Sequence, residues 1–329
     1  MTPVFVRTAE SDMHKTAPRP AMRWARWKRW LAIAACVFLC FLGGAWIYLW
    51  LHWPYGRRQV KAGLDKAYKG QVQMQSFKAV YFPHPGFLAT GLELHRSPGD
   101  PQPPPPLATA ERVIVEGRWS DLLTLQHRVR FVQIEGLRVS FPAKGTRERT
   151  LDFPPGDGKD FSGPQTFIEV VHVQNGLIEV GNAQGSPFQL KVHEVVVKDI
   201  VRGHASPFSV ILDNPKPAAL IHCDGWIGPL HSQHLDQLPV NANFTFLHGR
   251  LEDFDNLHGI IEGNGHFKGV LSALQVDADS TISSFSVGQG SPVKVGTQLR
   301  ATVDGMNGDV HFQSLDARAG ETTVHAPAW

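Results

Sequence analysis

From about residue 71 onward, apolar and polar side chains alternate with a period of two, and this pattern limits the folds open to the chain. Side chains of a β-strand point alternately to the two faces of a sheet, so the pattern predicts strands with one buried and one solvated face. The clearest run is VKVGTQLRATV (residues 293–303), and VNANFTF (240–246), FQLKV (188–192) and GLRVSF (136–141) repeat it. The sequence therefore predicts a mainly β protein.

Turn signals separate these runs. Asn175-Gly176 lies between two apolar runs, and this pair favours the positive φ angles of a type I′ turn, so we expect a hairpin there. Gly91, Gly136 and the stretch 304–309 are interpreted as further turns. Together these signals predict an antiparallel meander.

Helical signals are scarce in this part of the chain. Residues 55–70 carry apolar side chains at helical spacing and predict one short helix, and 119–125 and 251–257 are candidates for two more across a sheet end. The Pro-rich stretch 97–106 and the polar stretch 143–165 are expected to form exposed loops. With so few helices, the apolar sheet face must meet a second sheet, close into a barrel or hold a ligand.

The N-terminal part has a different character. Residues 31–51 contain no charged side chain, and a helix of this length covers roughly 30 Å, the thickness of a bilayer core. We therefore expect an uncleaved transmembrane helix over 31–53; a cleaved signal peptide is the alternative. The basic, Trp-rich stretch 23–30 favours a cytoplasmic tail over 1–30, which leaves 54–329 outside the cytoplasm.

Seven side chains that flank this helix are expected at the membrane interface, because tryptophan and arginine favour the headgroup layer. They are Trp24, Arg26, Trp27, Arg29, Trp30, Trp50 and Trp53. A membrane-active basic helix is the alternative interpretation of the Trp-Arg run.

Charge and cysteine content exclude some classes of protein. The net charge of +2 argues against a nucleic-acid-binding protein, which needs a concentrated basic face. Outside 31–53 the chain has one cysteine, Cys223, so an internal disulfide is excluded there and the fold must rest on packing. His231 and His234 lack a Cys or carboxylate partner at ligand spacing, and dinucleotide and nucleophile motifs are missing. We therefore expect no metal, no cofactor and no enzyme activity.

Several motifs in order along the chain resemble one family. YFPHPGFLATGLELHR (81–96) resembles the N-terminal signature of the AsmA family, and the run from Trp226 to Gly320 is similar to its continuation in large AsmA-like proteins. The recurring pieces of that run are the Gly-Pro pair 228–229, Gly259-Ile260, the glycines from Gly263 to Gly269, Phe285 and the block 303–309. The resemblance covers most of residues 31–325.

The resemblance implies an inner-membrane protein of diderm bacteria, anchored by a single N-terminal helix, with a periplasmic β-rich domain over 54–329. That domain would be an elongated, curved antiparallel β-sheet groove, β-taco-like in shape and similar to the bridge-like lipid transfer proteins. Such proteins are not known as enzymes and are tied to phospholipid transport toward the outer membrane and to cell envelope integrity. The implied partners are phospholipid, the inner membrane and envelope proteins. Because family members continue further, the sequence is expected to be truncated at its C-terminus.

A lipid groove would be lined by the in-phase apolar side chains of the predicted strands. We expect the lining to be Leu137, Val139, Phe141, Phe188, Leu190, Val192, Val240, Phe244, Phe246, Val293, Val295, Leu299 and Val303. The same side chains would instead fill the core of a closed sandwich or barrel. In that case the chain would be an envelope scaffold that binds protein partners through its sheet edges.

Overall fold

The structure, a computed structural model, describes most of the chain in two units. The described residues are 34–41, 43–44, 47–48, 53–68, 71–95, 106–124, 128–141, 167–181, 188–201, 203–229, 235–306 and 308–327. The chain divides into two units, Met1–Pro54 and Tyr55–Trp329.

In the first unit, residues 34–41, 43–44 and 47–48 are helical. Their large apolar side chains are exposed: Phe38 is 61%, Leu39 65% and Phe41 72% accessible. Within the described residues, no helix combines the length and the apolar character needed to cross a membrane. Much of the predicted span 31–53 and all of the predicted tail 1–30 lie outside the described residues, so both stay predictions.

The second unit contains short helices and the strands of one sheet. The helices are α2 (Arg57–Tyr68), α3 (Trp119–Leu123) and the 3-10 helices η2 (Leu235–Gln237) and η3 (Leu251–Asp253). The strands are β1 (Gln71–Val80), β2 (Gly86–His95), β3 (Ala108–Glu116), β4 (Arg128–Glu135), β5 (Arg138–Phe141), β6 (Phe167–Val180), β7 (Phe188–Ile200), β8 (Ser206–Pro215), β9 (Ala218–Ile227), β10 (Pro239–Arg250), β11 (Leu257–Val270), β12 (Ala273–Val287), β13 (Val293–Asp304), β14 (Asp309–Ala319) and β15 (Thr322–Pro327).

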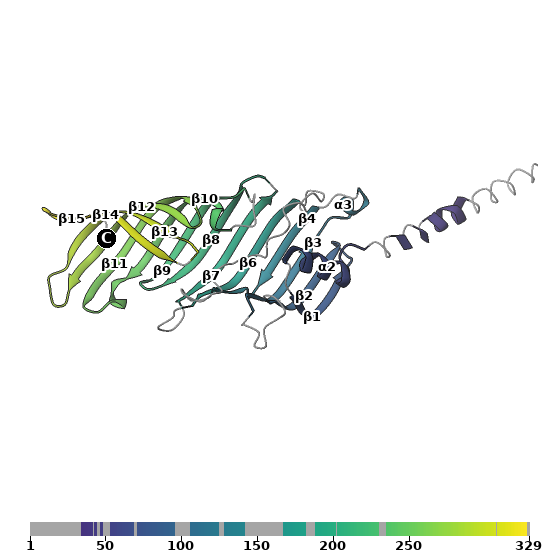
Figure 1. The fold of residues 1–329 in the computed structure, drawn as a ribbon, viewed down its shortest axis with the longest axis horizontal. Coiled ribbons are helices and arrows are strands. Elements are labelled where there is room, and N and C mark those ends of the chain that lie inside the picture. Colours follow the sequence, from purple (N-terminus) through teal and green to yellow (C-terminus); the bar gives the residue numbers. More distant parts are fainter. Residues whose placement is uncertain are drawn as a thin grey trace, which may run out of the picture. The chain divides into compact units, whose positions relative to one another are not determined.

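All fifteen strands belong to one sheet, which confirms the mainly β, largely antiparallel prediction. Its order follows the sequence from β1 to β15, except that β5 leaves the path and pairs with β3 and β6. Two pairings, β4–β6 and β5–β6, are parallel. Figure 1 shows the strands side by side in one twisted layer. Among the described strands β1 and β15 each pair with one neighbour, so this sheet is open.

The predicted hairpin at Asn175-Gly176 is wrong. Both residues lie inside the continuous strand β6, where Asn175 has a φ of 53°. The pair marks the point where the parallel partner of β6 changes from β4, which ends opposite Gln174, to β5, which begins opposite Leu177. An asparagine tolerates positive φ in a strand kink as well as in a turn, so the local signal could not distinguish the two.

The predicted turns at Gly91 and Gly136 are wrong for the same reason. Gly91, with a φ of 60°, lies inside β2, and Gly136, with a φ of 64°, separates β4 from β5, which both run parallel to β6. In contrast, the stretch 304–309 does turn between β13 and β14, where the Asp304 carboxylate accepts a hydrogen bond of 2.8 Å from the Met306 N–H.

Two of the three predicted helices are confirmed, and the third is shorter than predicted. The helices expected in 55–70 and 119–125 are confirmed as α2 and α3. The helix expected over 251–257 is wrong in extent, since η3 covers only its first three residues and Leu257 already begins β11. The two predicted loops lie outside the described residues, apart from Pro106.

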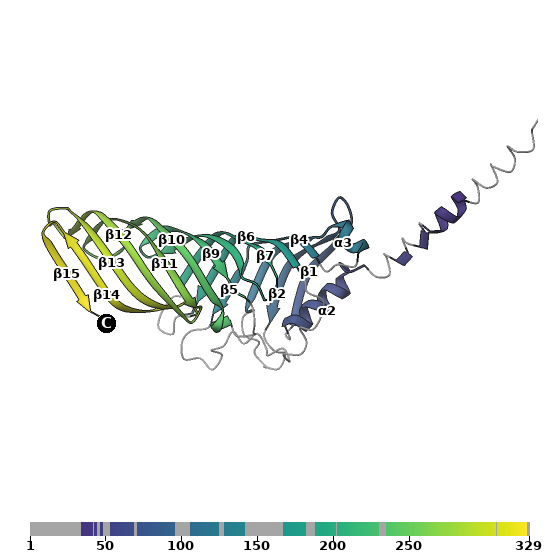
Figure 2. The ribbon, with the colours of Figure 1, turned by 90° about the horizontal axis from the view of Figure 1, so that it is seen from above.

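A buried cluster of the second unit lies between α2 and the first strands. Val72 of β1 is 1% exposed and packs with Leu107, and Leu64 of α2 and Leu92 and Leu94 of β2 pack against this pair. The Asp65 carboxylate of α2 also accepts a hydrogen bond of 3.2 Å from the Val72 N–H. Figure 2 shows α2 beside β1. The helix therefore covers one sheet face at its β1 end.

We expect Gly225→Ala to destabilise the sheet, because a Cβ on Gly225 would lie 2.5 Å from the Cα of Ala242 in the adjacent strand. Forcing such a contact costs about 1–3 kcal/mol. Gly296→Ala is the matched control: Gly296 also lies in a strand, yet no atom lies within 4 Å of its added Cβ. Denaturant unfolding should show a lower midpoint for Gly225→Ala alone; equal midpoints for both variants would contradict the close approach at Gly225.

Candidate functional site

One row of cross-strand neighbours is apolar along the whole sheet. Partners in adjacent strands point to the same face, so the register defines which side chains share it. This central row is Phe77, Ala89, Val113, Ile134, Val173, Val195, Val210, Cys223, Phe244, Gly265, Ala278, Leu299, Leu315 and Ala326. From β1 to β15 it holds no charged or amide side chain.

A second row on the same face runs beside the central row and is apolar as well. This flanking row is Ala79, Phe87, Val115, Val132, Val171, Val197, Phe208, Gly225, Ala242, Phe267, Val276, Ala301 and Phe312. We call the face that carries both rows the apolar face. At roughly 4.8 Å per strand, fourteen successive strands give the rows a length of about 60 Å.

Exposure varies along the apolar face. Ala89 and Ala242 are buried, at 0% and 2% exposed, whereas Phe188 and Val293 nearer the strand ends are 44% and 46% exposed. The described strands form one sheet, so within the described part of the chain no second sheet faces these side chains. Phe244 and Phe267 lie side by side there, with ring centroids 6.1 Å apart.

The register places the predicted groove residues on this face, with one exception. Ile178 is the cross-strand partner of both Val139 and Leu190, so these three side chains lie on the same face. In the same way, successive cross-strand pairs connect Val192 with Leu212, Ile221 and Phe246. Leu137 is the exception, because it precedes the first residue of β5 and has no assigned cross-strand partner. Its backbone carbonyl accepts a hydrogen bond of 2.7 Å from the Leu177 N–H. Whether lipid contacts the predicted set is not tested by the fold and stays a prediction.

The sequence analysis did not assign to the groove several side chains that complete the rows. Val171 and Val173 of β6 and Val195 and Val197 of β7 carry the same period of two and stand next to stretches that were recognised. The kink at Asn175 shifts the phase within β6, so the alternation before and after it appeared to belong to different strands.

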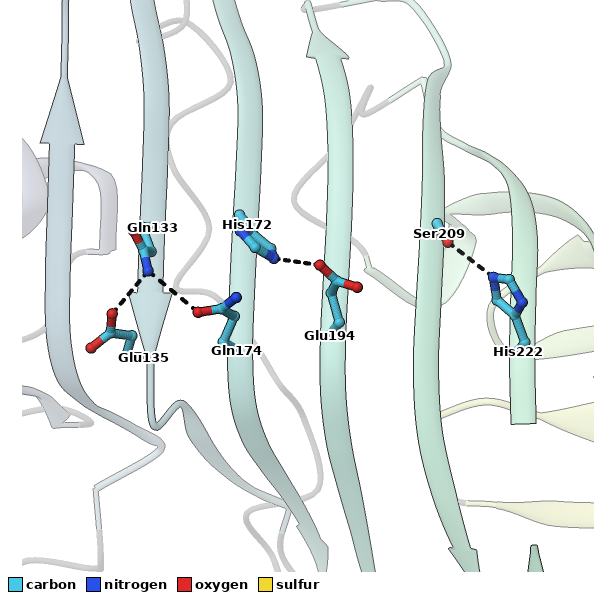
Figure 3. Close-up of polar contacts among 7 residues, drawn as sticks. All are labelled: Gln133, Glu135, His172, Gln174, Glu194, Ser209 and His222. Atoms are coloured by element: carbon cyan, nitrogen blue, oxygen red, sulfur yellow. Dashed lines mark hydrogen bonds and ion pairs between the residues drawn. The ribbon is translucent and has the colours of Figure 1, made fainter. Parts of the chain in front are cut away.

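The opposite face, called the polar face here, carries polar contacts within and between strands. Figure 3 shows His172 bonded to Glu194, Gln133 bonded to both Glu135 and Gln174, and Ser209 bonded to His222, across β4 to β9. Further along the sheet the Arg300 guanidinium lies 3.2 Å from the Asp277 carboxylate. The two faces of the sheet therefore differ, since these polar contacts lie on one face and both apolar rows lie on the other.

Cys223 stands in the central row, and burial, followed by the nearby Asp224 carboxylate, raises the pKa of its thiol to about 11. Burial, followed by the nearby Asp121 carboxylate, also raises the pKa of the Tyr55 hydroxyl. The native state thus holds these protons to a higher pH than the unfolded chain does. The stability that Cys223 contributes is complete below the ordinary cysteine pKa of 9.0 and is lost as the pH rises toward 11, whereas the contribution of Tyr55 starts to be lost only above the ordinary tyrosine pKa of 10.0.

We therefore expect the free energy of unfolding to fall between about pH 9 and pH 11. Cys223→Ala should reduce this decline without removing it, because Tyr55 remains. Denaturant unfolding of both proteins across this range checks the prediction, and identical slopes would contradict the buried state of the thiol.

Among the described residues, no group of three or more His, Cys, Asp or Glu side chains could hold a metal ion, and His231 and His234 lie outside those residues. The predicted interface residues other than Trp53 also lie outside the described part. Trp53 itself is 7% exposed.

No known protein family, curated protein or solved structure matches this chain. The resemblance to the AsmA family therefore stays a prediction.

Proposed function

We propose that this chain holds or conducts phospholipid acyl chains along its apolar face. In this proposal it is a single-pass inner-membrane protein of the AsmA family, with its N-terminus in the cytoplasm. Its periplasmic sheet would form a curved groove that contributes to lipid transport toward the outer membrane and to envelope integrity. The observation that carries the proposal is the pair of unbroken apolar rows.

The energetics of lipid transfer favour such a surface. Moving a sixteen-carbon acyl chain through water costs about 13 kcal/mol at roughly 0.8 kcal/mol per CH₂, and a two-chain lipid costs about twice that. A carrier needs a continuous apolar path, since each polar gap would expose part of the chain to water. The two rows offer such a path while the headgroup stays in solvent.

The first unit supports membrane anchorage in this proposal. Phe38, Leu39 and Phe41 expose large apolar side chains on a helical segment, and contiguous exposed apolar surface marks an interaction site. A bilayer would bury these side chains and hold the sheet close to a source of lipid.

Native mass spectrometry of the whole chain, released from membranes without lipid-like additives, tests the proposal. We expect bound species whose mass corresponds to phospholipid. A lipid-free protein that is folded and stable would overturn it.

The rival function is a scaffold that binds envelope proteins through its sheet edges. Among the described strands β15 pairs only with β14, and its Val324 is 57% exposed, which favours this function. A scaffold would tolerate charges on the apolar face as far as the fold allows, and would respond to proline substitutions in β15.

A further inference from the structure

A depression of about 690 Å³ is lined mainly by side chains of the polar face, and Phe208, Gly225 and Ala242 of the flanking row complete its lining. Its polar-face lining consists of two rows of four side chains from β7, β8, β9 and β10. One row is Lys198, Pro207, Trp226 and Asn241, and the other is Val196, Ser209, Asp224 and Asn243. The volume falls within the roughly 300–1,000 Å³ of small-molecule sites.

Trp226 is the most unusual member of this lining. It is 56% exposed on a face that is otherwise rich in charged and amide side chains. Its cross-strand partners are Pro207 on one side and Asn241 on the other, so a flat aromatic side chain stands between a small apolar and a polar neighbour. An exposed tryptophan with nothing to bury it offers a large apolar surface to a ligand.

Polar groups surround this ring. The Asn243 carbonyl oxygen lies 2.9 Å from His266 Nδ1, which leaves the Asn243 amide NH₂ as a donor toward the depression. Among the described residues, Lys198 and Asn241 make no side-chain hydrogen bond or ion pair. The site therefore combines one aromatic platform with several donors and acceptors.

We propose that this depression binds a neutral carbohydrate. A pyranose ring presents C–H bonds on one face, which suit the electron-rich face of an indole, and hydroxyls around its rim, which suit amides and carboxylates. The lining carries one cation, Lys198, and one anion, Asp224, so it favours an uncharged ligand over phosphate or a polyanion. The amide pair Asn241 and Asn243 would bind neighbouring hydroxyls. The proposal does not depend on lipid binding.

Titration of the full chain with tetra-N-acetylchitotetraose and with maltotetraose, in a detergent without a sugar headgroup, tests this site. Isothermal titration should detect binding of one of them below about 10 mM, a concentration that nearly saturates a site with a Kd of 1 mM. We expect Trp226→Ala to weaken binding at least about tenfold. Trp226→Phe, which keeps an aromatic ring, should weaken it less.

Leu220→Ala is the matched control, because Leu220 lies on the same strand and face but outside the depression, and is 37% exposed. It should bind saccharide like the native chain. Asn241→Ala, an exposed polar substitution with little effect on folding, should also weaken binding. If neither saccharide binds the native chain, or if Trp226→Ala and Asn241→Ala both bind as tightly as the native chain, the carbohydrate site is refuted.

Discussion

Phe244→Asp is expected to remove most of the phospholipid that copurifies with the protein. Phe244 lies in the middle of the central row, next to Phe267 and opposite Gly265. An aspartate in contact with acyl chains costs about 3 kcal/mol, which corresponds to roughly a hundredfold loss of affinity. Lipid extraction followed by quantitative mass spectrometry measures the effect.

Thr245→Asp controls for the added charge, since Thr245 is the next residue on the same strand and is exposed on the polar face. It should retain the native amount of lipid. Both variants should be compared at temperatures where circular dichroism shows an intact sheet. Equal lipid content in Phe244→Asp and Thr245→Asp would count against the apolar rows as the lipid path.

Val72→Asp is expected to have the largest effect on stability. Val72 of β1 is 1% exposed and packs against Leu64 of α2. Its backbone N–H already donates a hydrogen bond to the Asp65 carboxylate, so a new carboxylate at this position would be buried near a like charge. Burying an unpaired charge costs about 3–5 kcal/mol. The thermal unfolding midpoint should therefore fall by about 10 °C.

Gln73→Asp provides the matched substitution, because Gln73 is the exposed neighbour of Val72 on the other face of β1. Its midpoint should change little. If the two variants unfold at the same temperature, α2 does not pack on β1 as described.

The sequence predicted the strands and their faces well, because alternation reports directly on burial. Val293 to Val303, for example, forms one strand with its apolar side chains in phase, as expected. The pattern could not reveal how strands join: Asn175 and Gly91 have the conformation of turn residues, yet both kink strands that continue. Pairing partners far apart in sequence, such as β4 and β6, leave no local signal at all.

The same limit applies to the candidate sites. The alternation of apolar and polar residues predicted that Phe244 and Leu299 belong to the apolar face. Only the register of β10 to β13 shows that both lie in the same cross-strand row. Trp226 and Lys198 are 28 positions apart, and the sequence offers no reason to bring them together. Their meeting depends on the pairing of β7, β8 and β9.

The most direct test of the central claim is photo-crosslinking along β10 in native membranes. A photoreactive amino acid is placed in turn at residues 243, 244, 245 and 246, and crosslinked lipid is measured at each. The account predicts lipid adducts at Phe244 and Phe246 of the apolar face, and background levels at Asn243 and Thr245 of the polar face. Equal labelling at all four positions, or adducts to protein alone, would contradict it.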